Sequence, residues 1–108
     1  MNAAEVLQRL SATLASRKGA DPTTSYTAKL FAKGPDSILK KIGEESAELI
    51  MAAKDGEARP IICESADLLY HLLALLAFYD MGIDEVAQEL ARREGVSGID
   101  EKNARTAK

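Results

Sequence analysis

The 108-residue chain has a single cysteine, a single histidine and no tryptophan. Cys63 has no partner for an internal disulfide, so the fold does not require an oxidising compartment, and we expect a cytoplasmic protein. The chain also lacks a basic excess: 17 acidic residues outnumber 14 Lys and Arg, which gives a formal net charge of -3. General nucleic-acid binders carry the opposite balance, so we predict no nucleic-acid partner.

Long uncharged segments are missing as well. The longest run without a formal charge covers residues 68–79, which is shorter than the ~18 residues that a membrane-spanning helix needs. Glu5 and Arg9 lie among the apolar residues at the start of the chain, which is not the pattern of a signal peptide. We therefore expect no membrane partner.

The residues that are present indicate one soluble, all-α domain covering residues 1–108. Hydrophobic residues make up 46% and charged residues 29% of the chain, a mixture typical of a globular protein. Apolar residues recur at helical spacing, and no period-2 alternation typical of strands occurs. About five helices are predicted, followed by a polar C-terminal tail over residues 97–108. The predicted helices cover residues 2–17, 23–33, 35 to about 54, 61–81 and 84–95.

The predicted helix over residues 61–81 is apolar in nearly every direction around its axis. Such a helix is expected to be central and buried on most sides. A chain of this length has few surfaces of its own to cover it. We therefore expect a homodimer, in which a second copy completes the helical bundle.

Three carboxylates gather on one side of the helix that begins at Pro35. At about 100° per residue, Glu48 projects between Glu44 and Glu45, so all three share one stripe. This stripe borders the apolar face, whereas a purely solvated acidic stripe would lie opposite it. Like charges at this spacing repel each other, so a compensating partner is expected.

A second acidic pair, Glu64 and Asp67, lies on the most apolar helix. Buried acids need a partner, yet residues 60–88 contain no Lys or Arg. The turn signals at residues 55–60 make the two acidic helices antiparallel neighbours. Four or five carboxylates would then converge on one cavity.

A cluster of this kind, made only of oxygen ligands, suits Mg²⁺, with Mn²⁺ as a possible substitute. Zinc favours His and Cys ligands, and a ferritin-like di-iron site requires a His that the Glu64–Asp67 pair lacks. The competing interpretation is a solvated acidic stripe whose spacing arose by chance.

Basic residues occur near the acidic stripe and in the tail. Lys29 and Lys33 are one helical turn apart, and Lys41 projects toward the stripe, where it either contacts a metal-bound phosphate or pairs with Glu45. In the tail, Lys102 and Arg105 either fold over a substrate or belong to a frayed end.

His71 lies four residues after Asp67. It is either a general base or partner of a ligand carboxylate, or a core histidine bonded to Asp67 or to the backbone.

Four segments of the chain resemble the phosphoribosyl-ATP pyrophosphohydrolase family. They are residues 25–31 (SYTAKLF), 40–48 (KKIGEESAE), 64–73 (ESADLLYHLL) and 97–102 (SGIDEK). The acidic pattern alone is shared with the wider all-α, MazG-like superfamily, which includes dimeric dUTPases. The first and last segments narrow the resemblance to this family.

The resemblance implies a MazG-like helical bundle that hydrolyses phosphoribosyl-ATP to phosphoribosyl-AMP and pyrophosphate, the second step of histidine biosynthesis. It implies a Mg²⁺-dependent, cytoplasmic homodimer. Glu45, Glu48, Glu64 and Asp67 are then the expected metal ligands, and Glu44 a ligand or a carboxylate that orients water. The expected phosphate-binding residues are Lys29, Lys33, Lys41, Lys102 and Arg105.

Two other functions fit the same residues. One is a housekeeping pyrophosphatase that cleaves dUTP or another nucleoside triphosphate at the same metal site. The other is a non-catalytic helical dimerisation module with a solvated acidic stripe. Faster cleavage of phosphoribosyl-ATP than of other nucleotides would distinguish the expected enzyme from the housekeeping pyrophosphatase. Binding of Mg²⁺ would distinguish it from the dimerisation module.

Overall fold

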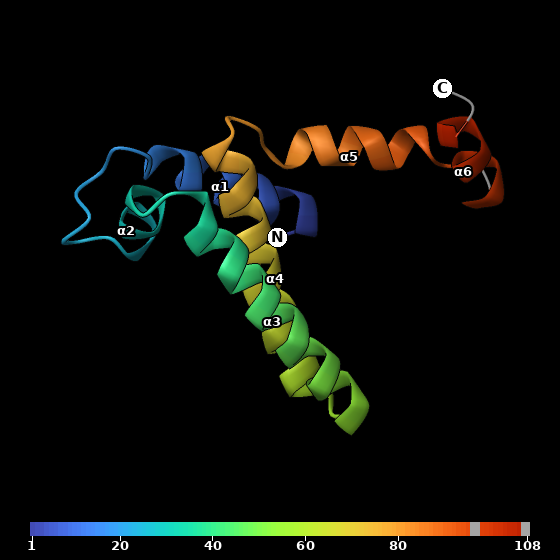
Figure 1. Cartoon of the computed structure of the whole chain (residues 1–108), viewed down its shortest axis with the longest axis horizontal. Helices are drawn as coiled ribbons and strands as arrows, with labels where there is room; N and C mark the ends of the chain where they lie inside the picture. Colours follow the sequence, from blue (N-terminus) through green and yellow to red (C-terminus); the bar gives the residue numbers. More distant parts are fainter. Residues whose placement is uncertain (96–97, 107–108) are drawn as a thin grey trace.

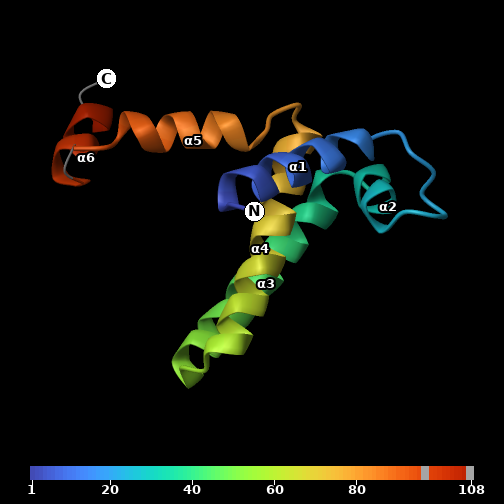
Figure 2. The same cartoon turned by 180° about the vertical axis from the view of Figure 1, so that it is seen from behind.

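The computed structural model describes residues 1–95 and 98–106, and within them the chain forms six helices and no strands (Figure 1). The all-α prediction is confirmed. The long helices α3 and α4 pair as a hairpin, α1 and α2 lie at one end of it, and α5 and α6 project from that end as an arm (Figures 1 and 2). The elements are α1 (Ala3–Ser16), α2 (Tyr26–Ala32), α3 (Pro35–Asp55), α4 (Ala58–Phe78), α5 (Ile83–Arg92) and α6 (Gly98–Thr106).

Local sequence signals set the ends of the hairpin helices. Pro35 occupies the start of α3, where its missing N–H has no partner to lose. Gly56 ends α3 with φ 78°, a left-handed conformation that glycine adopts without strain. Helix α4 begins at Ala58, one turn earlier than predicted, because Pro60 lies within the first turn, whose N–H groups have no acceptor inside the helix.

The C-terminal tail differs from the prediction. A polar tail was expected over residues 97–108, but residues 98–106 form α6; positions 97, 107 and 108 lie outside the described residues. The tail lacks an apolar stripe, which is the signal that the prediction used. Lys102, Ala104 and Arg105 nevertheless have high intrinsic helix propensity, and this favours a helix without a core-facing side.

The fold of one chain is extended. Its radius of gyration is 16.1 Å, whereas a compact domain of about this length has ~13 Å. The hairpin and the arm diverge (Figure 1), and α5 has no buried residue.

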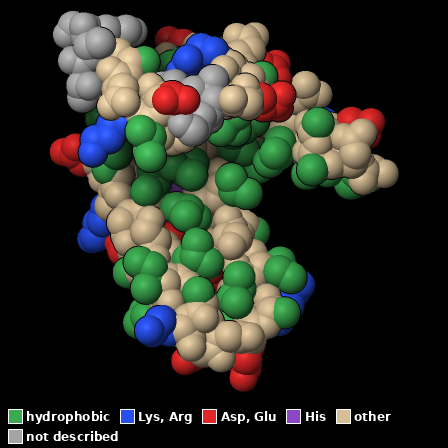
Figure 3. Space-filling view, turned by 90° about the vertical axis from the view of Figure 1, so that its right-hand side faces the viewer, with side chains coloured by type: hydrophobic (Ala, Val, Ile, Leu, Met, Phe, Trp, Pro, Cys, Tyr) green, Lys and Arg blue, Asp and Glu red, His purple; other side chains and the backbone are tan. Residues whose placement is uncertain are grey.

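Helix α4 is less covered than the sequence predicts. Ile62, Leu69 and Leu72 remain exposed along it, and hydrophobic side chains gather on the face shown in Figure 3. By length and composition α4 could cross a membrane, which is weak evidence because core helices of soluble proteins pass the same test. The expectation that α4 is buried on most sides is therefore wrong for a single chain.

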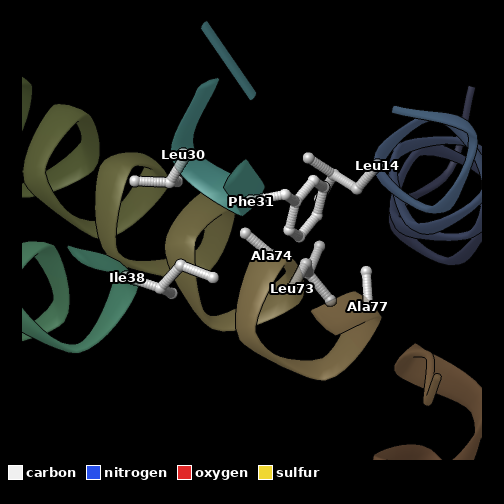
Figure 4. Packing of buried hydrophobic residues seen from close by; sticks show 7 residues of the cluster. All are labelled: Leu14, Leu30, Phe31, Ile38, Leu73, Ala74 and Ala77. Carbon is white, nitrogen blue, oxygen red and sulfur yellow. The ribbon is translucent and has the colours of Figure 1, made fainter. Parts of the chain in front are cut away.

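The core lies where α1, α2, α3 and α4 meet (Figure 4). Leu14, Ile38 and Leu73 are its largest fully buried side chains. The rings of Phe31 and Phe78 stack with their centroids 6.4 Å apart. This core anchors α2 beside the start of α3, and thereby positions the polar residues described next.

Candidate functional site

The α3–α4 hairpin brings acidic residues of the two helices together, as the sequence predicts. The pKa of Glu64 is raised, first because the Glu48 carboxylate lies within hydrogen-bonding reach, and then because the group is partly buried. The negative charges of Glu48, Asp67 and Glu45 raise it further. Glu45 and Glu48 of α3 therefore interact with Glu64 and Asp67 of α4, and these four residues form the acidic cluster.

Two carboxylate oxygens in this cluster are buried without a hydrogen-bond donor: Oε1 of Glu45 and Oε2 of Glu64. Burial raises the pKa of Glu45, and the neighbouring imidazole of His71 partly offsets this rise. A buried oxygen without a donor is costly unless a proton or a cation satisfies it. The donor set consists of carboxylate oxygens, which suits a hard divalent cation.

The side chains do not form a finished metal site as they stand. Within residues 1–95 and 98–106, no group of three or more His, Cys, Asp or Glu is arranged so that it could hold a metal ion. Carboxylates without a compensating positive charge repel each other, which disfavours a tight cluster. The four residues thus have the ligand atoms that a divalent cation prefers and lie close to one another. Their side chains must move closer together before all of them can bind one ion.

His71 lies 6% exposed at the inner edge of this cluster. Its Nδ1 is 3.0 Å from the backbone oxygen of Asp67, in hydrogen-bonding geometry, and 2.6 Å from Oε1 of Glu45. The Glu45 oxygen lies off the N–H direction, so it does not receive a full hydrogen bond. Nε2 is 2.9 Å from the hydroxyl of Tyr26 on α2. His71 is buried and bonded to the backbone, as a core histidine would be, and it also contacts Glu45, an expected metal ligand, and Tyr26.

A basic cavity of about 490 Å³ opens beside the acidic cluster, between α2 and the first half of α3. This size falls in the range of small-molecule sites. Four lysines contribute to it, together with Glu44 from the acidic stripe. Its lining residues are Tyr26, Lys29, Leu30, Lys33, Ser37, Lys40, Lys41 and Glu44. Positive charge for phosphates and negative charge for a cation are therefore adjacent.

The structure separates the predicted phosphate-binding residues into two groups. Lys29, Lys33 and Lys41 line the cavity, and no ion pair joins Lys41 to Glu45 in the part of the chain that is described. Lys102 and Arg105 lie on α6, at the far end of the arm and away from α2 and α3 of the same chain (Figure 1). The fold of a single chain therefore does not bring them to the cavity.

Three further polar residues line the cavity that are not among the predicted phosphate-binding residues: Tyr26, Ser37 and Lys40. A periodic signal was available. On α3 the spacing of Ser37, Lys40, Lys41 and Glu44 is i, i+3, i+4, i+7, which describes one face of a helix. On α2, Tyr26, Lys29 and Lys33 follow the same rule.

Comparison with known proteins gives consistent matches. A family model described as phosphoribosyl-ATP pyrophosphohydrolase matches residues 7–94. A phosphoribosyl-ATP pyrophosphatase of Dechloromonas aromatica (strain RCB) is 65% identical over 108 residues, which cover all of both chains. That of Bordetella avium (strain 197N) is 56% identical, over 96% of this chain and 92% of its own length. That of Aromatoleum aromaticum is 55% identical, over 94% of each chain.

Proposed function

This chain belongs to the phosphoribosyl-ATP pyrophosphohydrolase family, and from that premise we propose that it hydrolyses phosphoribosyl-ATP to phosphoribosyl-AMP and pyrophosphate, the second step of histidine biosynthesis. The observation that carries the assignment to a site is the lysine-lined cavity of about 490 Å³ directly beside the α3–α4 carboxylates. A triphosphate placed there meets cationic side chains at one end and an acidic cluster at the other.

Glu45, Glu48, Glu64 and Asp67 would hold Mg²⁺, with Mn²⁺ as a possible substitute. The buried oxygens of Glu45 and Glu64 that have no donor support this assignment. When bound, the cation would neutralise phosphate charge and stabilise the leaving pyrophosphate. The hydrolysis that we propose breaks the α–β phosphoanhydride with water and leaves phosphoribosyl-AMP and pyrophosphate.

The chain's own residues supply binding and proton transfer. Lys29, Lys33, Lys40 and Lys41 attract the triphosphate as point charges on flexible stems. Glu44 is exposed and lines the cavity, and this supports its assignment as the carboxylate that orients a water molecule and accepts its proton.

The deciding experiment mixes the purified chain with phosphoribosyl-ATP and measures pyrophosphate. We expect release that depends on Mg²⁺ and that is much faster than with dUTP or ATP. Faster cleavage of dUTP would instead identify a housekeeping pyrophosphatase. No cleavage of any nucleotide, at any Mg²⁺ concentration, would contradict the enzymatic assignment and leave the helical dimerisation module.

Mg²⁺ is also expected to stabilise the folded chain without substrate. A ligand that binds only the native state adds about 2.7 kcal/mol at 100 times its Kd. Thermal unfolding in 0.1 to 10 mM Mg²⁺ measures this shift, with the same ionic strength maintained by NaCl as the control. An unfolding midpoint that is the same with and without Mg²⁺ or Mn²⁺ would contradict the proposed metal site.

The exposed apolar residues support a homodimer. On α4, Ile62, Leu69 and Leu72 follow the spacing i, i+7, i+10 and form one stripe. On the arm, Val86 and Leu90 are exposed one turn apart. A second copy packed on these surfaces would cover them, and its α6 would bring Lys102 and Arg105 toward the cavity of the first. The enzyme would act in the cytoplasm, the setting that a fold without disulfides suits.

Sedimentation tests the dimer directly. We expect twice the chain mass of 11.6 kDa for the wild type. Leu69→Glu places a charge in the α4 stripe and is expected to give a folded monomer at micromolar concentration, because burying an unpaired carboxylate is costly. Ala12→Glu, at an exposed position on α1, is the matched control and should remain a dimer. A wild-type monomer at all concentrations would contradict the proposal.

A further inference from the structure

The only histidine of the chain joins the basic cavity to the acidic cluster. Tyr26 lines the cavity, and its hydroxyl lies 2.9 Å from His71 Nε2, within hydrogen-bonding distance. On the other side of the ring, Nδ1 is 2.6 Å from Oε1 of Glu45. Three helices thus contribute to one chain of contacts: Tyr26 from α2, Glu45 from α3 and His71 from α4.

The neighbours of the imidazole determine where its protons lie. Both groups next to Nδ1 are acceptors, namely the backbone oxygen of Asp67 and the carboxylate of Glu45. Nδ1 therefore carries a hydrogen. In the neutral ring Nε2 is then the acceptor, and it receives the Tyr26 hydroxyl. The donors then follow one order: Tyr26 donates to His71, and His71 donates to the backbone oxygen of Asp67, while the Glu45 carboxylate lies 2.6 Å from the same ring nitrogen.

Packing also holds the ring in place. The Tyr70 ring meets the imidazole edge to face with centroids 5.2 Å apart, and Tyr26 does so at 6.1 Å. Tyr70 is itself held by a hydrogen bond between its hydroxyl and the buried Thr27. With two ring nitrogens bonded and two aromatic neighbours, His71 has little freedom to rotate. The ring is therefore held in one orientation, with its Nδ1 in contact with Oε1 of Glu45.

We propose that Tyr26 and His71 are positioning residues that orient the Glu45 carboxylate for cation binding. The inference rests on the proposed function, because it assigns to these residues the support of a metal ligand. Groups that hold a ligand in place without touching the metal change metal affinity by about 10- to 100-fold when they are removed. A histidine that served packing alone would have no such effect once the fold is intact.

Three variants and one control test the proposal by calorimetric titration of the full-length protein with Mg²⁺ or Mn²⁺ alone. His71→Leu is expected to raise the Kd for the cation about 10- to 100-fold. His71→Asn retains a donor near the position of Nδ1 and is expected to recover most of that loss. Tyr26→Phe keeps the aromatic ring and removes one hydrogen bond, so a rise of about 2- to 10-fold is expected. Tyr79→Phe, on an equally exposed tyrosine at the end of α4, should match the wild type.

Activity gives a second measurement. The Mg²⁺ concentration that half-activates pyrophosphate release should rise in His71→Leu by the same factor as the Kd. The KM for phosphoribosyl-ATP should change little, because His71 does not line the cavity. Circular dichroism and thermal unfolding confirm that each variant is folded before it is compared.

The single histidine also provides a signature that is independent of any metal. Nitrogen-detected NMR of the neutral imidazole should show the Nδ1–H tautomer in the wild type and a larger share of Nε2–H in Tyr26→Phe. A wild-type ring with hydrogen on Nε2 would overturn the proposal, as would folded His71→Leu and Tyr26→Phe variants that bind the cation like the wild type. If the wild type itself bound no divalent cation, that result would contradict the proposed metal site. It is therefore distinct from the result that contradicts the positioning role, in which the wild type and the variants bind the cation equally.

Discussion

Glu48→Gln and Asp67→Asn are each expected to lower the turnover of phosphoribosyl-ATP by at least about 100-fold while the helical content stays unchanged. Each substitution replaces a charged oxygen ligand by a neutral amide of the same shape. The developing charge on the phosphates then loses part of the compensation that a bound cation provides. Steady-state release of pyrophosphate at saturating Mg²⁺ measures the effect.

Stability should not account for this loss. The side chains of Glu48 and Asp67 are exposed, and exposed substitutions usually change the free energy of unfolding by less than about 0.5 kcal/mol. Glu48 raises the pKa of Glu64 through proximity and charge. Its replacement by Gln removes like-charge repulsion, so the metal-free variant should be at least as stable as the wild type.

Matched controls lie outside the hairpin cluster. The control variants are Glu94→Gln and Asp55→Asn. Glu94 lies just after α5 and Asp55 is the last residue of α3, and both residues are exposed. These two variants should retain wild-type turnover. If Glu48→Gln and Asp67→Asn retained it as well, the acidic cluster would not be the active site, whatever the remaining activity of the chain.

Leu73→Ala is expected to lower the free energy of unfolding by about 2–5 kcal/mol, the range for removing a large aliphatic side chain from a packed core. Leu73 is 2% exposed and lies with Leu14 and Phe31 where α1, α2 and α4 meet (Figure 4). Truncation removes buried apolar surface and leaves a cavity that rigid neighbouring helices fill only in part. Chemical denaturation, monitored by circular dichroism, measures the change.

The comparison variant is Leu39→Ala on α3, where the side chain is 49% exposed. It deletes the same atoms from a site in partial contact with water, so a loss below about 1 kcal/mol is expected. Both variants are compared at a concentration where sedimentation shows the same oligomeric state. Equal destabilisation by the two would mean that the core does not lie at the junction of α1, α2 and α4.

Periodicity and turn signals were sufficient for helices α1 to α5 and for the convergence of the acids, but not for α6, which has no apolar stripe. Pro35 and Gly56 delimit α3 through backbone geometry that depends on one residue each. Because the connection between α3 and α4 is short, the two helices had to be antiparallel neighbours, which placed Glu48 and Glu64 together. Local signals were weaker at Pro60, which lies inside the first turn of α4 and does not mark its start.

The sequence by itself determined helices α1 to α5, the acidic cluster and the lysines beside it, because each follows from spacing along one helix or across one tight turn. Tertiary structure alone decided three further features. Tyr26 and His71 are 45 positions apart and meet only because the core packs α2 against α4. The exposed stripe on α4 and the direction of the arm that carries Lys102 and Arg105 likewise depend on how helices pack. Periodicity shows which face of a helix is apolar, but what covers that face depends on contacts between residues far apart in the chain.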